Sequence, residues 1–245
     1  MNVQIEVTTR CNYDCFYCAG RDMEQRDMPF DAYLAVMDNH VARHGLPRQV
    51  SLQGEGEPTL NKAFFEMAAH ARSIGAEPYT ITNGTYRYPE HFRESFRAIG
   101  VSIDSLDPGE AERIGRYNLE RVLEFVDAAS KFVEVIVHTV ALSPSSFAVT
   151  EWCRKRGLRQ IVQPLQAKDD YRQRYPGRVV LLHRPKLFQC GYLSKDIMRY
   201  YAVDGSEFPC CFIKDANSYR SIDDLRATLA RGTVPPSCAG CSNLC

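Results

Sequence analysis

Strand-like and helix-like stretches alternate along residues 2–166, and this alternation constrains the fold more than any other feature of the sequence. Val3, Ile5 and Val7 alternate with polar residues, which is the period of a strand. Between residues 30 and 41 the apolar residues recur at spacings of three and four, which is the period of a helix. About six such strand–helix units predict an α/β fold with a parallel sheet, curved into a partial (β/α)6 barrel.

The expected strands carry a polar face opposite the apolar one. Fully buried parallel strands would read as continuous apolar runs, which these do not. The inner face of the barrel is therefore expected to be polar and to have room for a ligand, although strands at a sheet edge with water on one side would give the same pattern. The residues assigned to this face are Gln4, Glu6, Ser51, Gln53, Thr82, Ser102, Asp104, His138 and Gln163.

The element boundaries follow from the same periodicities and from the Gly, Pro and Asn residues that begin or end helices and strands. After residue 166 a stretch rich in charge, Tyr and Pro replaces the pattern, and an Asp-Gly turn within 202–211 predicts a hairpin. We expect strands at 3–7, 49–53, 78–83, 101–105, 133–140 and 159–165, and helices at 30–41, 61–75, 90–99, 118–126, 147–156 and 223–229.

Nine of the ten cysteines fall in two groups, residues 11–18 and 190–245, and Cys153 is most simply a small buried apolar side chain. No stretch reaches the ~18 apolar residues of a membrane span, and no secretory signal is visible, so a cytoplasmic location is expected. Disulfides are rare there, so clustered cysteines indicate metal binding or chemistry. The net charge of zero indicates neither a nucleic-acid nor a membrane partner.

The first group, Cys11-x3-Cys15-x2-Cys18, follows the first expected strand. Three thiolates can hold three irons of a [4Fe–4S] cluster and leave the fourth iron open, and an open coordination site is where a metal centre does chemistry. A zinc ion is the alternative. It would need a fourth ligand nearby, and no histidine precedes His40.

This triplet, with the aromatic Tyr17 before its last cysteine, resembles the radical S-adenosylmethionine superfamily. The resemblance implies an open-site [4Fe–4S] cluster that cleaves S-adenosylmethionine into methionine and a 5′-deoxyadenosyl radical, which abstracts hydrogen from a substrate. A flavodoxin- or ferredoxin-like protein would supply the electron. In such enzymes the cofactors carry the chemistry, and the protein orients and shields it.

Further segments of residues 2–166 agree with the resemblance. Gly54-Glu55-Gly56-Glu57-Pro58 is similar to the family's GGEP motif, Thr82-Asn83-Gly84 to its TNG segment, and Val101–Ser105 to its fourth strand. Glycines allow close approach of the backbone to a ligand, and a carboxylate accepts from an ammonium group. The residues that the resemblance assigns to cofactor binding are Tyr17, Gly54, Gly56, Glu57, Pro58, Asn83, Ser102 and Asp104.

The second cysteine group resembles the SPASM or shortened Twitch extensions of this superfamily, because a cysteine precedes the expected hairpin, another follows it, and a Cys-x2-Cys lies near the end of the sequence. The resemblance implies a second, closed [4Fe–4S] cluster, with a structural zinc at the same cysteines as the alternative. It leaves Cys211 and Cys245 unassigned. The implied ligands are Cys190, Cys210, Cys238 and Cys241.

The expected organisation is a partial barrel over residues 1–166, an irregular connection over 167–189 and a small cysteine-rich module over 190–245. Because so few residues bury little core, this module is a candidate for stabilisation by a bound metal.

A closed second cluster implies an electron acceptor, and hence a two-electron oxidation such as dehydrogenation of a small-molecule alcohol in a biosynthetic pathway. Epimerisation, cross-linking or side-chain oxidation of a ribosomally made peptide is the alternative, which the lack of an extension before the first strand disfavours. Proton acceptors are expected among Glu6, Asp104 and His138, for which a purely structural role is equally open. Outside this class, the chain could be a non-catalytic iron–sulfur protein or a zinc-binding interaction protein.

Overall fold

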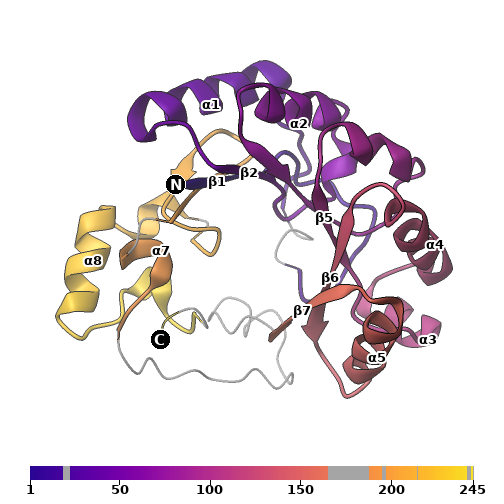
Figure 1. Ribbon diagram of the computed structural model, residues 1–245. Helices are drawn as coiled ribbons and strands as arrows, with labels where there is room; N and C mark the ends of the chain where they lie inside the picture. The colour runs from indigo at the N-terminus through magenta and orange to yellow at the C-terminus, as the bar shows by residue number, and fades with distance from the viewer. Residues whose placement is uncertain (19–22, 165–187, 195–196, 214, 242–243, 245) are drawn as a thin grey trace.

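The computed structural model describes residues 1–18, 23–164, 188–194, 197–213, 215–241 and 244. Its strands form two sheets that follow one another around a curved wall, with the long helices outside (Figure 1). One sheet has the order β3-β2-β1-β8-β9 and the other β4-β5-β6-β7, and every pair except β8–β9 is parallel. This confirms the predicted α/β partial barrel. The strands are β1 (Asn2–Ile5), β2 (Gln49–Leu52), β3 (Glu77–Tyr79), β4 (Ile81–Thr82), β5 (Ala98–Ser102), β6 (Glu134–Ala141), β7 (Arg159–Pro164), β8 (Met198–Tyr201) and β9 (Glu207–Phe208).

The predicted strand over 78–83 is divided at Thr80, where one sheet ends and the other begins. The Thr80 hydroxyl donates to the carbonyl oxygen of Leu52 at 2.7 Å, so a side chain replaces the ladder contact at this position. The curved wall therefore has a seam between β3 and β4.

The helices of the barrel match the expected positions with two exceptions, and the single helical turn at Gly191–Ser194 was not predicted. Residues 90–99 were expected to be helical, but only a 3₁₀ turn forms, because the buried run Ile99-Gly100-Val101 already belongs to β5. The strand predicted over 101–105 therefore begins and ends about three residues earlier, at Ala98–Ser102. The helices are α1 (Phe30–His44), α2 (Phe64–Ser73), α3 (Pro108–Ile114), α4 (Leu119–Ala129), α5 (Ser146–Arg156), α7 (Gly191–Ser194) and α8 (Ile222–Ala230), with 3₁₀ turns η2 (Pro58–Leu60), η3 (Pro89–Glu94), η4 (Ala216–Ser218) and η5 (Pro236–Cys238).

Helix α3 is the second exception, since no helix was predicted over residues 108–114. Its signal is present: Asp107 caps the helix by accepting from the Glu110 amide at 2.6 Å, and Pro108 occupies the first turn. The helix ends at Gly115, whose φ of 94° is left-handed.

The predicted hairpin over 202–211 is confirmed, with Gly205 at φ 83° in its turn. Its first strand, β8, also pairs in parallel with β1, in the register Val3 to Arg199 and Ile5 to Tyr201. The hairpin thus extends the sheet of the barrel.

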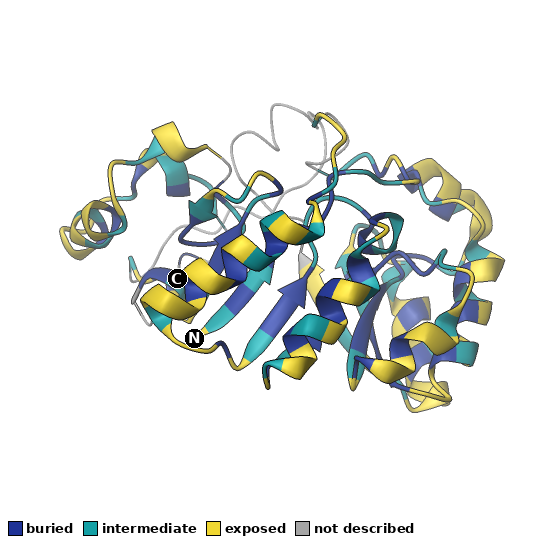
Figure 2. Ribbon diagram, turned by 90° about the horizontal axis from the view of Figure 1, so that it is seen from above, coloured by how far each residue is buried: buried dark blue, intermediate teal, exposed yellow. Residues whose placement is uncertain are grey.

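Two hydrophobic cores lie on either side of this hairpin. The larger core fills the space between the sheets and the outer helices, and the strands between these helices are largely buried (Figure 2). It contains the fully buried side chains of Val3, Ile5 and Val101. The smaller core gathers Tyr200, Leu225 and three cysteines of the second group. Among the described residues, none of the helices combines the length and the apolar character that a membrane crossing requires.

The boundary residues 165 and 166, most of the expected connection over 167–189, and Cys245 lie outside the described residues.

Candidate active site

A cavity of about 260 Å³ opens at the carboxyl ends of β1, β2, β4 and β5, which is where parallel α/β folds bind their ligands. All three cysteines of the first group line it. So do the residues of the glycine-rich turn and the polar residues that end the next two strands. The lining relevant to chemistry comprises Cys11, Cys15, Cys18, Tyr17, Gly54, Glu55, Gly56, Glu57, Thr82, Asn83, Ser102 and Arg116.

The cysteine loop is fixed by backbone contacts with the end of α3. The Asp14 amide donates to the Gly115 carbonyl oxygen at 3.1 Å, and the Phe16 amide donates to Ile114 at 2.9 Å. A Cβ at Gly115 would lie 2.5 Å from the Asp14 carbonyl oxygen, so the contact needs a glycine there. Burial raises the pKa of the Cys15 thiol. A buried thiolate needs positive charge beside it, as a metal centre supplies.

The glycine-rich turn lies along the segment that leads into this loop. The Gly56 amide donates to the Thr8 carbonyl oxygen at 3.2 Å and the Glu57 amide to Arg10 at 2.7 Å. A Cβ at Gly56 would lie 2.5 Å from the Arg10 oxygen, and one at Gly54 would lie within 2.3 Å of another side chain. Gly56 is therefore required by close packing of the turn against the backbone of residues 8–10, and Gly54 by close packing against the Glu6 side chain.

Glu57 is buried and its carboxylate accepts four hydrogen bonds. One oxygen accepts from the Thr59 amide at 3.2 Å, the Thr59 hydroxyl at 2.7 Å and the Thr82 hydroxyl at 2.7 Å, and the other accepts from the Asn83 amide at 2.6 Å. Burial raises its pKa, and these donors oppose the shift. The carboxylate is thus held rigidly at the cavity wall, and Pro58 begins η2 directly behind it.

Asn83 links the next strand to the cysteine loop, because its amide nitrogen donates to the Asn12 side-chain oxygen at 2.8 Å. Asn12 in turn donates to the Thr85 hydroxyl at 2.9 Å. The TNG-like segment and the cysteine loop therefore form one continuous wall of the cavity.

Arg116 is a site residue that the sequence analysis missed. Its guanidinium pairs with Asp104 Oδ2 at 2.7 Å, donates to the Tyr17 hydroxyl at 2.6 Å and donates to the Ser102 carbonyl oxygen at 3.2 Å. Tyr17 also donates to Asp104 at 2.5 Å. A buried cation is therefore fixed beside Cys15, and three residues assigned to cofactor binding are held by it.

The three expected proton acceptors occupy different surroundings. Both oxygens of Glu6 accept from backbone amides, and Asp104 also accepts from the Val140 amide at 2.8 Å, so these two carboxylates are engaged in structural contacts. The His138 Nε2 lies 2.8 Å from the Tyr79 hydroxyl. Burial lowers the pKa of His138 to about 4, and within the part of the chain that the structure describes its Nδ1 has no partner.

Three cysteines of the second group, Cys190, Cys210 and Cys238, lie in the smaller core, and Cys241 lies close to them. Burial raises the pKa of Cys238 to about 11, and the neighbouring thiols of Cys210, Cys241 and Cys190 add to this shift. An isolated bridge between Cys190 and Leu244 brings the end of the sequence to this place. These four cysteines come from three segments of the chain, at residue 190, residue 210 and residues 238–241.

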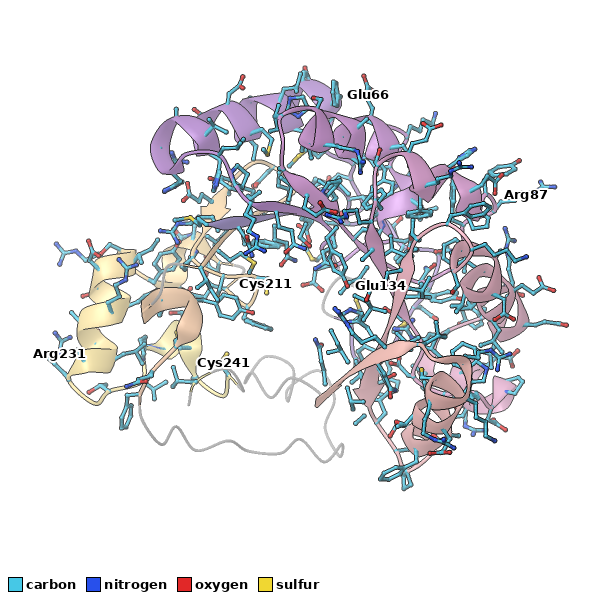
Figure 3. All side chains as sticks on the ribbon, viewed as in Figure 1. Glu66, Arg87, Glu134, Cys211, Arg231 and Cys241 are labelled. Atoms are coloured by element: carbon cyan, nitrogen blue, oxygen red, sulfur yellow. The ribbon has the colours of Figure 1, made fainter. Side chains whose placement is uncertain are left out.

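Cys211, left unassigned by the sequence, lies near Tyr192, whose pKa is raised to about 12 by burial and by the thiols around it. Cys211 and Cys241 both lie on the side of the C-terminal part that faces away from α8 (Figure 3). Across the described ranges, no three His, Cys, Asp or Glu side chains are arranged to hold a single metal ion.

The family model of the radical SAM superfamily matches residues 5–145. The chain belongs to this superfamily. Its members use a [4Fe–4S] cluster and S-adenosylmethionine, and the cavity with its three cysteines fits this pair.

Curated relatives share part of their length with this chain. It is 28% identical over 137 residues to an S-adenosylmethionine-dependent nucleotide dehydratase of Selenomonas ruminantium, with 54% of this chain and 49% of the relative covered. It is 30% identical over 173 residues to a GTP 3′,8-cyclase of Brucella canis, with 64% and 50% covered. The chain thus spans about half the length of these relatives.

Solved structures with this fold align over nearly the whole chain. A structure of anSMEcpe with bound AdoMet and Cp18Cys peptide has a TM-score of 0.63 at 16% identity, covering 98% of this chain and 82% of the other. BtrN in complex with AdoMet and 2-DOIA has a TM-score of 0.52 at 16% identity, covering 100% and 93%. Streptococcus suis SuiB bound to S-adenosylmethionine has a TM-score of 0.54 at 14% identity, covering 99% and 71%. At these identities the likeness concerns the fold.

Proposed function

We propose that this chain catalyses a two-electron oxidation, dehydrogenating an alcohol group of a small molecule in a biosynthetic pathway. Residues 190–245 would form a Twitch-type module that holds a second [4Fe–4S] cluster. When bound, the first cluster and S-adenosylmethionine supply a hydrogen-abstracting radical, and the second cluster supplies an acceptor for the remaining electron.

The observation that carries this proposal is the contrast between the two cysteine sets. Cys11, Cys15 and Cys18 line an open cavity, whereas the second set has four neighbouring cysteines, three of them within a packed core. Three ligands leave a coordination position for a reacting molecule, and four leave none. The second set therefore suits electron transfer better than substrate binding.

The chain's own residues would bind and orient the cofactor at the first set. Gly56 allows the turn to lie close to the segment that leads into the cysteine loop, and Glu57 presents a fixed carboxylate to the methionine ammonium group. Arg116 and Tyr17 give the cavity a cationic and aromatic wall. All of these groups are held before any ligand arrives, which lowers the cost of ordering the site.

The substrate would lie against the polar inner face of the barrel. Gln4 and Gln53 line the cavity, and within the described residues the Gln53 side-chain oxygen is buried without a partner. The neutral pair Tyr79 and His138 lies beside Ile81, a residue of the cavity wall, since side-chain atoms of all three lie 2.8 Å from where a Cβ at Gly100 would be. Such neutral polar groups suit hydroxyl groups of a substrate, and His138 is the proposed acceptor of the proton released on oxidation.

Modification of a ribosomally made peptide is the second candidate. Its support is that anSMEcpe and SuiB, which share the fold, have been solved with a peptide and with the precursor peptide SuiA, respectively. Both candidates need the same radical and differ in the substrate, so the test has to separate generation of the radical from its use.

The test uses Cys238→Ala, with Cys153→Ala as the matched control because Cys153 is a buried cysteine of α5. After anaerobic reconstitution with iron and sulfide, we expect about eight irons in the wild type and the control, and about four in Cys238→Ala. On reduction, all three proteins should form 5′-deoxyadenosine. Only the wild type and the control should oxidise a substrate drawn from a panel of cyclic polyols.

A wild-type protein that binds only zinc, or that forms no 5′-deoxyadenosine, would contradict the enzyme itself. Retention of full oxidation by Cys238→Ala would contradict the electron-acceptor role. Turnover of precursor peptides but not of polyols would favour the second candidate.

A further inference from the structure

Glu6 joins two parts of the chain that are far apart in sequence. It directly follows β1 and is 1% exposed. One carboxylate oxygen accepts from the Glu55 amide at 3.0 Å, and the other accepts from the Val203 amide at 3.3 Å. Its own amide donates to the Tyr201 carbonyl oxygen at 2.8 Å. One side chain therefore holds both the glycine-rich turn and the turn of the β8–β9 hairpin.

Each of these contacts leads to a different cysteine set. The Glu55 carbonyl oxygen lies 3.6 Å from the Cys18 sulfur, so the first contact reaches the cavity. Val203 lies in the turn that connects β8 to β9, and β9 ends two residues before Cys210. A series of contacts therefore connects Cys18 with the strand before Cys210, and it passes through the buried Glu6 carboxylate.

The packing around Glu6 leaves it little freedom to adjust. A Cβ at Gly54 would lie 2.3 Å from the Glu6 Cγ, so the turn presses on the side chain. On the other side, Val203 belongs to the main core and is 9% exposed. Packed groups of this kind transmit a displacement, because they have no empty space in which to absorb it.

We propose that Glu6 is a positioning residue that couples S-adenosylmethionine binding at residues 54–58 to the order of the β8–β9 hairpin, and through it to the second cysteine set. A ligand that fixes the 54–58 turn fixes the Glu55 amide, and this keeps the carboxylate in place for the Val203 amide. Losing either acceptor would leave a buried donor unsatisfied, which is costly. By linkage, the coupling acts equally in both directions.

This role is distinct from proton transfer. Both Glu6 oxygens accept from backbone amides, so the carboxylate is engaged in holding two turns in place. The geometry therefore assigns Glu6 to holding the backbone and leaves the proton to another group.

The test measures amide hydrogen exchange in peptides spanning residues 198–208 of the reconstituted protein, with the clusters oxidised so that S-adenosylmethionine binds without being cleaved. We expect S-adenosylmethionine to slow exchange in the wild type by about fivefold or more. Glu6→Gln keeps the size of the side chain but replaces one acceptor with an NH₂ group. It should bind S-adenosylmethionine about tenfold more weakly and should lose the slowing. Glu134→Gln, an exposed carboxylate on β6 (Figure 3), should behave as the wild type.

Unchanged exchange in the wild type on binding would overturn the proposal, and this measurement suffices if Glu6→Gln does not fold. A Glu6→Gln protein in which S-adenosylmethionine still slows hairpin exchange as in the wild type would also overturn it, since Glu6 would then be only structural. The inference rests on S-adenosylmethionine binding at the turn and not on the reaction that follows. A protein that does not oxidise an alcohol would therefore contradict the proposed reaction but not the role of Glu6.

Discussion

At the scale of single residues, His40 shows how a buried polar group ties α1 to the C-terminal hairpin. Its Nδ1 lies 3.0 Å from the Tyr201 hydroxyl, and its side chain is fully buried. Burial, together with the nearby His44, lowers the pKa of His40 from 6.5 to about 4. Protonation of His40 therefore opposes the folded state.

The free energy of unfolding should fall as the pH decreases from 6.5 toward 4, because over this range the unfolded chain binds a proton that the folded His40 does not. Between pH 7 and pH 5 this loss amounts to about 2 kcal/mol. His40→Gln should make the pH dependence shallower by that amount in urea unfolding. His91→Gln, at an exposed histidine, should keep the wild-type dependence, and an equal slope in all three proteins would refute the assignment.

Arg116 illustrates which site residues a sequence cannot reveal. Cys11, Cys15, Cys18 and Glu57 lie in local motifs whose spacing reports their chemistry, and the structure brings them to one cavity. Arg116 has no such motif. Its partner Asp104 is twelve residues away, on the other side of α3, so the role of Arg116 exists only in the folded chain.

At the scale of elements, the end of α3 determines where the cysteine loop lies. Gly115 combines a left-handed φ of 94° with a Cβ position 2.5 Å from the Asp14 carbonyl oxygen. Gly157 ends α5 with a comparable φ of 66°, but nothing lies within 4 Å of its Cβ position. A comparison of the two glycines therefore separates the cost of a left-handed backbone, which both positions share, from the cost of a steric clash, which only Gly115 has.

Gly115→Ala should displace the cysteine loop and lower the iron retained at the first site, in addition to the cost of about 1 kcal/mol for a left-handed alanine. Gly157→Ala should incur only that backbone cost and keep its full iron content. The measurement is iron per chain after reconstitution, together with the thermal midpoint. Equal iron contents in the two variants would show that the α3 contact does not support the site.

Periodicity predicted most of these elements, because their buried faces follow simple spacings. It failed at residues 90–99, where the apolar residues Phe92 and Phe96 suggested a helix but the chain has to reach β5 by Ala98. Helix α3 was missed because it has only two buried residues, Ala111 and Ile114, too few for a visible stripe. In both segments the position of the chain in the fold determined the secondary structure, and the local spacing of apolar residues did not.

At the scale of the whole molecule, β8 is a wall shared by the two cores. Tyr201 points into the main core and the adjacent Tyr200 into the smaller core with the cysteines, as the alternation of a strand requires. The sequence could predict the hairpin from its Asp-Gly turn. It could not predict the pairing of β8 with β1, because nothing local reports which edge a strand joins.

This shared wall predicts that the two cores unfold together. Tyr200→Leu removes buried contacts from the smaller core and should cost about 2 kcal/mol. Because β8 is hydrogen-bonded to β1 along its whole length, the loss should lower the unfolding midpoint of the barrel as well, and far-UV circular dichroism and cluster absorbance should shift by the same amount. Tyr88→Ala, at a 44% exposed tyrosine on the barrel surface, should change neither midpoint. If cluster absorbance were lost well before the circular dichroism signal, the C-terminal part would unfold on its own, and the sheet pairing would not make the molecule one cooperative unit.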